Sequence, residues 1–311
     1  MPDHATNDGT RLVYDDLGAH PDAKPVVLLH GWSLDRTCWE HQVPALLAAG
    51  RRCVAYDRRG HGRSEVPGQG YDADTLADDL AGLMNALDLR GATLISHSMG
   101  AGEIVRYLAR HGAQRVDRVV LLAPTTPMLL ATAGHPVGLT PEMVKDALAE
   151  FTRDRARWFQ ERRDDYFALG AGQPRVSRAF AEHTMRICLA TPPHVAVCCQ
   201  RVILTTDFRS DVAACTVPTL VLHGDADRSA VLELTGQPTA DLLPDADLRV
   251  YPGAPHGLYA THAAEVNAEL LAFLDGKQPG EEDPARSNEQ RWKRHRNSIG
   301  HPARDTDPGS Q

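Results

Sequence analysis

Short apolar segments alternate with longer amphipathic segments along most of the chain. Six short segments are rich in Val and Leu, are bounded by Gly, Pro or Asp, and lie at 26–30, 53–57, 92–96, 119–123, 218–223 and 248–252. Nearly continuous apolar strands between helices are typical of a parallel sheet with helices on both faces. The pattern therefore predicts an α/β protein. A polar, alternating stretch at 11–15 predicts an edge strand of an antiparallel hairpin ahead of that sheet.

The amphipathic segments have the spacing of helices. In segment 74–87 the apolar residues fall on one helical face, which we assign to the core: Leu76, Leu80, Leu83, Met84 and Leu87. A second pattern spans 141–159, where Thr140 is the expected N-cap and Pro141 the first helical residue. A third pattern lies near 177–189. All three segments are therefore predicted as helices.

A long interval without a strand-like segment separates the fourth and fifth of the apolar strands. It covers 124–215 and concentrates aromatic residues in a chain that has only 5% of them: Trp158, Phe159, Tyr166, Phe167 and Phe180. An aromatic-rich helical insertion over the carboxyl ends of a parallel sheet is where a lid with an apolar pocket would lie. The alternative is that these aromatics only attach the insertion to the body.

These features divide the chain into four parts. We expect the first part of an α/β core at 1–123, a helical lid at 124–215, the second part of the core at 216–275, and a disordered C-terminal tail at 276–311. The tail holds four prolines, and its strong core formers are limited to Trp292 and Ile299. Such a segment buries too little apolar surface to offset the entropy of ordering.

Composition and charge exclude several classes of protein. The 311 residues are 42% hydrophobic and 24% charged, as in soluble globular proteins, and the formal net charge is −8. A negative field repels nucleic acid and anionic membrane surfaces, so we expect no nucleic-acid or membrane partner. The sequence has no run of 18 apolar residues and no signal-peptide pattern near Met1, so we expect a cytoplasmic location.

The cysteines and histidines indicate no metal centre. Six cysteines stand at irregular spacings without a C-x-x-C pair, which predicts reduced and mostly buried thiols. Fifteen histidines include no H-E-x-x-H motif and no tight cluster. No motif in the sequence therefore announces a metal site, and we expect none.

Candidate chemistry begins at 96–100, SHSMG, between an apolar strand and a helical pattern. A serine on a sharp strand-to-helix turn, with small residues two positions before and after it, is typical of a nucleophile elbow. The usual motif is G-x-S-x-G, and this chain has Ser96 at the first position. Ser98 is the expected nucleophile. The alternative is an ordinary helix N-cap.

A serine nucleophile needs a base, and the base needs a carboxylate that orients it. The strand at 218–223 runs into two carboxylates, Asp225 and Asp227, and the strand at 248–252 runs into a loop that carries His256. Both would reach the same edge of the sheet as Ser98. The chain order of serine, acid and histidine is that of one doubly wound fold. Either carboxylate fits this pattern.

The chain resembles the α/β-hydrolase fold superfamily, and within it the cofactor-free (non-haem) bacterial haloperoxidase and arylesterase group. The resemblance covers about 7–273 and rests on several blocks in order: His30-Gly31-Trp32 with Trp39, 55–64 (AYDRRGHGRS), 71–79 (YDADTLADD), 96–107 (SHSMGAGEIVRY), and 253–258 (GAPHGL) with Thr261-His262. It implies the α/β-hydrolase fold, a mostly parallel sheet with helices on both faces and a helical lid inserted late in the sheet.

The resemblance also assigns roles to residues. It implies a catalytic triad of Ser98, Asp227 and His256, with the acid at the last position of H-G-x-x-D rather than at Asp225. It implies an oxyanion hole formed by the backbone N–H groups of Trp32 and Met99. The other polar residues of these blocks are assigned to loop structure or local packing: His30, His61, His97, Asp57, Arg58, Arg59 and Arg63.

The implied activity is hydrolysis of small carboxylic esters through an acyl-enzyme, with hydrogen peroxide as an alternative acyl acceptor that would give haloperoxidase activity. Ser33 follows Trp32 where many peroxide-using relatives have proline, which argues against perhydrolysis, and Ala230-Val231 replaces a frequent proline after the acid. Relatives often assemble, so a homo-oligomer is compatible with the resemblance. Two other functions stay open: a carbon-carbon hydrolase or hydroxynitrile-lyase-like enzyme on the same triad, and a non-catalytic small-ligand-binding module.

Overall fold

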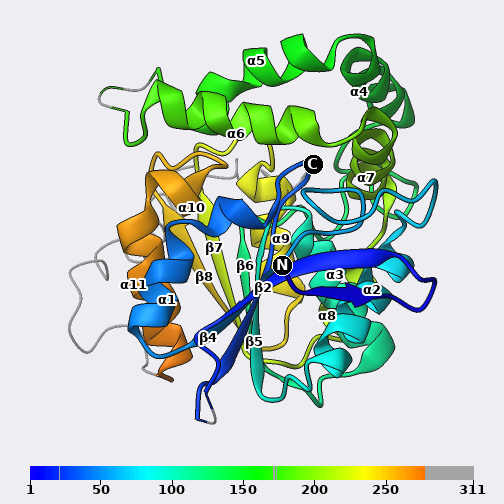
Figure 1. Ribbon diagram of the computed structural model, residues 1–311. Coiled ribbons are helices and arrows are strands. Elements are labelled where there is room, and N and C mark those ends of the chain that lie inside the picture. Colours follow the sequence, from blue (N-terminus) through cyan, green and yellow to red (C-terminus); the bar gives the residue numbers. More distant parts are fainter. Residues whose placement is uncertain (21, 171, 173, 277–311) are drawn as a thin grey trace, which may run out of the picture. The chain divides into compact units, whose positions relative to one another are not determined.

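An eight-stranded sheet forms the centre of the fold in the computed structural model (Figure 1). The structure describes residues 1–276 except 21, 171 and 173. Its strands are β1 (Asp3–Ala5), β2 (Arg11–Leu17), β3 (Pro25–Leu29), β4 (Arg52–Tyr56), β5 (Ala92–His97), β6 (Val116–Leu122), β7 (Thr219–Gly224) and β8 (Ala246–Tyr251). Their order is β1-β2-β4-β3-β5-β6-β7-β8, and only the β1–β2 and β2–β4 pairs are antiparallel.

The six predicted apolar strands are β3 to β8, so the predicted parallel sheet is confirmed. Alternate residues of a strand face opposite sides of a sheet. In β3, Val27 and Leu29 pack into the layer that contains α2 (Ala73–Ala86) and α3 (Gly100–His111), whereas Val26 and Leu28 pack into the opposite layer. Burial on both faces is why β3 to β7 appear as nearly continuous apolar runs in the sequence.

Helices cover both faces of the sheet. Figure 1 shows α1 (Gln42–Ala48) and α11 (Ala263–Leu274) on one side, and α2, α3 and α8 (Arg209–Ala213) on the other. The predicted helix at 74–87 is α2, whose N-cap Asp72 accepts a hydrogen bond from the Thr75 N–H at 2.9 Å. Two short helices, α9 (Gly236–Leu242) and α10 (Leu258–Thr261), follow β7 and β8.

The antiparallel hairpin expected at the start of the sheet is present. Its strand β2 pairs with β1, so that Asp3 lies opposite Val13. The β1 strand is only three residues long and largely exposed. It therefore has no apolar alternation that sequence inspection can detect.

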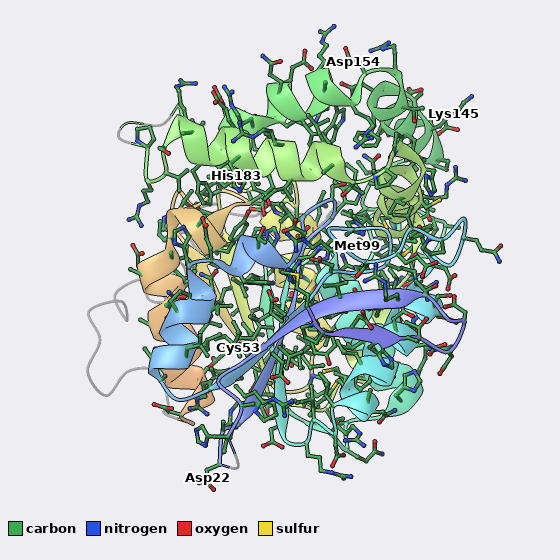
Figure 2. All side chains as sticks on the ribbon, in the orientation of Figure 1. Asp22, Cys53, Met99, Lys145, Asp154 and His183 are labelled. Carbon is green, nitrogen blue, oxygen red and sulfur yellow. The ribbon has the colours of Figure 1, made fainter. Side chains whose placement is uncertain are left out.

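Four helices lie between β6 and β7 before α8: α4 (Pro141–Arg153), α5 (Arg155–Tyr166), α6 (Arg178–Ala190) and α7 (Pro193–Thr205). Figure 1 shows them gathered beyond one end of the sheet. Thr140 caps α4, as predicted, and Ser177 caps α6. The single helix predicted over 141–159 is wrong. The chain turns at Asp154 (φ −156°), whose carboxylate accepts from the Arg157 N–H and starts α5 (Figure 2).

Within the described part of the chain, no single helix is long and apolar enough to cross a membrane, and only the α6–α7 pair, bent by 99°, meets the same test together. The tail expected to be disordered, 276–311, lies outside the described residues except for Gly276.

Candidate active site

Ser98 lies on a sharp turn between β5 and α3. Its backbone has φ 55°, in the left-handed region that non-glycine residues rarely adopt, and its N–H donates to the Leu122 carbonyl at 2.9 Å. A strained backbone held by the surrounding structure is frequent at active sites. The turn presents the Ser98 side chain at the carboxyl end of β5, as a nucleophile elbow requires.

Small residues on both sides of Ser98 make the turn sterically possible. A Cβ atom at Gly100 would lie 3.0 Å from both the Leu29 carbonyl oxygen and the Ser96 Cβ. There is therefore no room for a side chain at position 100. The serine at position 96, which departs from the usual glycine, is tolerated because its small side chain still fits beside Gly100.

Three side chains that are far apart in the sequence meet at this turn. His256 Nδ1 lies 2.6 Å from Asp227 Oδ2, and His256 Nε2 lies 3.0 Å from Ser98 Oγ. A carboxylate oxygen only accepts, so Nδ1 carries the proton and donates to Asp227. In the neutral imidazole Nε2 then accepts, and the Ser98 hydroxyl donates to it. His256 Nε2 is therefore within hydrogen-bond reach of the Ser98 hydroxyl proton.

Asp227, rather than Asp225, contacts the histidine. The Asp227 Oδ1 atom accepts from the N–H groups of Ser229 and Ala230, both at 2.8 Å, and the side chain is buried. Burial raises the pKa of Asp227, but the imidazoles of His256 and His223 outweigh it and bring that pKa below its usual value. Asp227 is therefore ionised. Asp225 instead accepts from the Gly253 N–H at 2.6 Å.

The Gly31–Trp32 peptide is fixed by His30. The Arg58 N–H donates to His30 Nε2 at 3.0 Å, so the proton of His30 is on Nδ1, which donates to the Gly31 carbonyl at 2.8 Å. In a trans peptide the N–H points opposite to the C=O. The Trp32 N–H therefore points away from His30.

In the part of the chain that the structure describes, two backbone N–H groups assigned to the oxyanion hole have no protein acceptor. Among the described residues, neither the Trp32 nor the Met99 amide donates a hydrogen bond to another residue. Figure 2 labels Met99 between the sheet and the helices above it. Both residues were expected to supply oxyanion donors, and their free amides are compatible with that role.

The helices between β6 and β7 bring aromatic rings to the same end of the sheet. The Trp32 ring lies 5.1 Å from Phe151, 5.4 Å from Trp158 and 5.6 Å from Phe159, and its Nε1 donates to the Ala196 carbonyl at 2.8 Å. Near His256, the Tyr166 ring lies 5.2 Å away, edge to face. Aromatic residues of α4 and α5 therefore pack against Trp32, and Tyr166 at the end of α5 contacts His256.

The loop that carries His256 is anchored to the end of α5. The Gly257 N–H donates to the Tyr166 carbonyl at 2.9 Å, and a Cβ at Gly257 would lie 2.7 Å from the Phe167 ring. Only glycine fits this contact. The insertion therefore contributes directly to the position of His256.

A small pocket lies beside Met99. Its wall is mostly apolar and comes from α2, α7 and the segments after β6 and α7: Leu76, Thr125, Val202, Ile203 and Phe208. Glu103, on the first turn of α3, also borders it.

The remaining polar candidates serve loop structure. Burial lowers the pKa of His61 to about 3, and its Nδ1 donates to the Arg59 carbonyl at 2.9 Å. Asp57 accepts from the Arg36 side chain and from the N–H groups of Arg36 and Arg63.

All six cysteines are free, and all except Cys198 are buried. No group of three His, Cys, Asp or Glu side chains able to hold a metal ion occurs in the described ranges.

One residue near the site was missed by sequence reasoning. His223, the first residue of the H-G-x-x-D motif, is fully buried, and its Nε2 lies 3.3 Å from Asp227 Oδ2. In the sequence, this motif indicates Asp227 directly. The contact of His223 with Asp227 could have been predicted because a histidine stands at the end of a buried strand, four residues before the acid.

Comparisons with known proteins identify the family of this chain. A family model described as alpha/beta hydrolase fold matches residues 24–263, and the chain belongs to that family. It is 37% identical to the non-heme chloroperoxidase CPO-A1 of Kitasatospora aureofaciens over 278 residues. The aligned region covers 88% of this chain and 100% of that protein. The resemblance inferred from the sequence is therefore confirmed, and the chain is an enzyme of the hydrolase class.

Two further relatives add detail. The bifunctional esterase/perhydrolase DCH of Acinetobacter calcoaceticus is 33% identical over 275 residues, which are 86% of this chain and 98% of that protein. The crystal structure of bromoperoxidase from Bacillus anthracis superposes with a TM-score of 0.82 at 37% identity and covers 88% of this chain and 99% of that chain.

Proposed function

We propose that this chain cleaves small carboxylic esters through an acyl-enzyme on Ser98. The observation that carries the proposal is the unbroken chain of hydrogen bonds from Asp227 through His256 to Ser98, at 2.6 and 3.0 Å. The esterase/perhydrolase and chloroperoxidase relatives support the same reaction class. A triad of this kind activates a hydroxyl that is a poor nucleophile at neutral pH.

The reaction follows from the positions of these groups. His256 Nε2 takes the proton of Ser98 as Oγ attacks the ester carbonyl, and ionised Asp227 stabilises the resulting imidazolium. The oxyanion accepts hydrogen bonds from the Trp32 and Met99 amides, and each such donor contributes roughly 3 kcal/mol of transition-state stabilisation. His256 then protonates the leaving alcohol. Water, deprotonated by His256, attacks the acyl-enzyme and releases the carboxylic acid.

Water is the principal acceptor in this proposal, with peroxide as a side reaction. If hydrogen peroxide attacks the acyl-enzyme in place of water, the product is a peracid, which oxidises halide outside the site. Ser33, next to Trp32, has φ 58°. The ring of proline restricts φ to about −65°. The loop after Trp32 therefore has a backbone that proline cannot adopt, which supports hydrolysis over perhydrolysis.

The parts of the chain have proposed roles as well. The insertion at 124–215 would be a lid, because its aromatic residues Phe151, Trp158 and Phe159 contact Trp32 and its Tyr166 contacts His256. The segments 1–123 and 216–275 would form the core that carries the triad. Free thiols at all six cysteines support a cytoplasmic setting. The homo-oligomer stays a prediction.

Hydrolysis of a series of p-nitrophenyl esters with acyl chains of two to eight carbons, with and without hydrogen peroxide, tests the function. We expect turnover of the shorter esters, a smaller perhydrolysis rate, and loss of both in Ser98→Ala. Ser96→Ala is the matched control, because it removes a buried, unpartnered hydroxyl two residues away and keeps the Cβ beside Gly100.

Two outcomes would overturn the proposal. Equal turnover in Ser98→Ala and the parent enzyme would exclude the acyl-enzyme. Labelling of Ser98 by a fluorophosphonate without turnover of any ester would move the function to carbon-carbon bond cleavage or to ligand binding.

A further inference from the structure

A second imidazole contacts the proposed acid. His223 is the penultimate residue of β7, and none of its side chain is exposed. Its Nε2 lies 2.7 Å from the Ala230 carbonyl oxygen and 3.3 Å from Asp227 Oδ2. His256 Nδ1 approaches the same Oδ2 atom at 2.6 Å. Two histidines therefore share one oxygen of Asp227.

The protonation of His223 follows from its partners. A carbonyl oxygen only accepts, so the proton of His223 is on Nε2, which donates to the Ala230 carbonyl and lies close to Asp227 Oδ2. Its Nδ1 is buried without a hydrogen-bond partner among the described residues. A Cβ at Gly236 would lie 2.2 Å from this Nδ1, so α9 closes that side of the ring. The ring therefore donates on one side only and cannot pass a proton onward.

The Asp227 carboxylate accepts three hydrogen bonds and also contacts His223. Oδ1 accepts from the amides of Ser229 and Ala230, Oδ2 accepts from His256, and His223 Nε2 lies 3.3 Å from the same Oδ2. The same His223 N–H also holds the Ala230 carbonyl. The loop that carries Asp227 is thus fixed to β7 at both the carboxylate and the main chain.

We propose that His223 is a positioning residue for the triad. Through its neutral Nε2–H group, His223 holds Asp227 Oδ2 in line with His256 Nδ1. This proposal deepens the proposed function and rests on it. His223 touches no substrate and exchanges no proton in the reaction. Its contribution is to fix the orientation of the carboxylate that supports the imidazolium of His256.

Two substitutions of similar size separate donation from packing. His223→Gln keeps an N–H within reach of Asp227 and Ala230, whereas His223→Met fills similar space without a donor. We expect His223→Met to lower kcat by about tenfold or more at nearly unchanged KM, because the N–H group that holds Ala230 and lies beside the ionised Asp227 carboxylate is lost. His223→Gln should recover most of that loss.

The pH profile gives a readout that packing alone would not move. The titratable groups that face His223 are Asp227, His256 and His97. In His223→Met we expect the acid limb of the pH profile of kcat/KM to move to lower pH. A misplaced Asp227 carboxylate stabilises the protonated form of His256 less well. Val221→Ala is the control. It alters a buried residue of the same strand that packs in the hydrophobic core, and it should leave kcat and the acid limb unchanged.

A measurement on the unsubstituted protein covers the case in which His223→Met does not fold. In nitrogen-15-labelled enzyme at pH 7, NMR should show His223 as the neutral Nε2–H tautomer. An Nδ1–H tautomer or a charged ring would overturn the proposal, and so would a kcat and acid limb in His223→Met equal to those of Val221→Ala. Loss of activity in Ser98→Ala together with full activity in His223→Met would leave the proposed function intact and remove only this inference.

Discussion

The imidazole of His97 donates a hydrogen bond of 3.1 Å to the main-chain carbonyl of His256, although the two residues are 159 positions apart. The carbonyl only accepts, so the His97 proton is on Nε2. Burial, together with the nearby His256, lowers the pKa of His97 well below its usual value, and the ring stays neutral. His97 immediately precedes Ser98, so this bond ties the nucleophile turn to the loop that carries the proposed base.

Removal of this bond should slow the reaction without weakening ester binding. We expect His97→Leu to lower kcat about tenfold at unchanged KM, because small displacements of reacting groups are costly in rate. His97→Gln, which keeps an N–H near the His256 carbonyl, should retain most of the activity. Steady-state kinetics of both variants on one p-nitrophenyl ester makes the comparison. Full activity in His97→Leu would show that the bond is irrelevant to positioning.

Gly257 tests the contact between the insertion and the His256 loop. In Gly257→Ala the new methyl group would lie 2.7 Å from the Phe167 ring and 2.8 Å from the Tyr166 carbonyl oxygen. Since neither the ring nor the backbone has room to yield, we expect a loss of stability of about 1–3 kcal/mol. A loss of kcat/KM should accompany it, because His256 moves with the loop. Urea denaturation and ester kinetics measure the two effects.

The control for this experiment is Gly68→Ala. A Cβ at Gly68 meets no atom within 4 Å, and its backbone is not in the left-handed region. Stability and kcat/KM should stay at the parent values. If both glycine variants behave alike, the contact with Tyr166 and Phe167 does not position His256.

Much of the fold was predictable because the central strands are buried on both faces. The residues of β5 and β7 are all buried, so these strands appear as apolar runs even in a single sequence. The break between α4 and α5 was not predictable from periodicity, because the apolar residues Phe151 and Phe159 continue in helical spacing across it. Asp154 caps a new helix there, and an aspartate within a helical pattern is also compatible with an uninterrupted helix.

The stability of the protein should fall in acid partly through His61. Burial lowers the pKa of His61 in the folded protein to about 3, whereas the pKa of a histidine in the unfolded chain is about 6.5. Between these values the unfolded chain binds the extra proton. The free energy of unfolding therefore decreases by about 1.4 kcal/mol for each pH unit below about 6 on account of this group alone.

His61→Asn isolates that contribution. The asparagine side chain keeps an N–H for the Arg59 carbonyl, to which His61 Nδ1 donates, but it does not titrate. Urea denaturation at pH 7, 6, 5 and 4 should give a shallower loss of stability in the variant, whereas the difference between variant and parent should be constant above pH 7. Parallel stability curves for the two proteins across this range would contradict the assignment of a neutral, buried His61.

Phe151 should hold the insertion to the body. It is fully buried and packs against the rings of Trp32, Trp158 and Phe159. We expect Phe151→Ala to lower the free energy of unfolding by about 3–5 kcal/mol, because a large aromatic side chain leaves a cavity. Phe151→Leu should cost less. Urea denaturation followed by tryptophan fluorescence measures both, and an unchanged midpoint in Phe151→Ala would show that the aromatic cluster does not anchor the insertion.

The site was only partly predictable from the sequence. Asp225 and Asp227 both follow β7, and only their three-dimensional positions separate them: one accepts from the Gly253 amide and the other from His256. The contact of His223 with Asp227 depends on how the loop after Gly224 folds back on the strand. The conformation of this loop depends on hydrogen bonds within it, such as those that the Ser229 and Ala230 N–H groups donate to Asp227. The spacing of residues in the sequence does not predict these bonds.

The covalent intermediate is the most direct test of the account. Parent enzyme mixed with a p-nitrophenyl ester and quenched in acid within milliseconds should show, by mass spectrometry, one acyl group on the peptide that contains Ser98. Ser98→Ala should show none, and His256→Ala should acylate far more slowly. An acyl group on another residue, or turnover in Ser98→Ala at the parent rate, would contradict the role assigned to the serine, histidine and aspartate at this edge of the sheet.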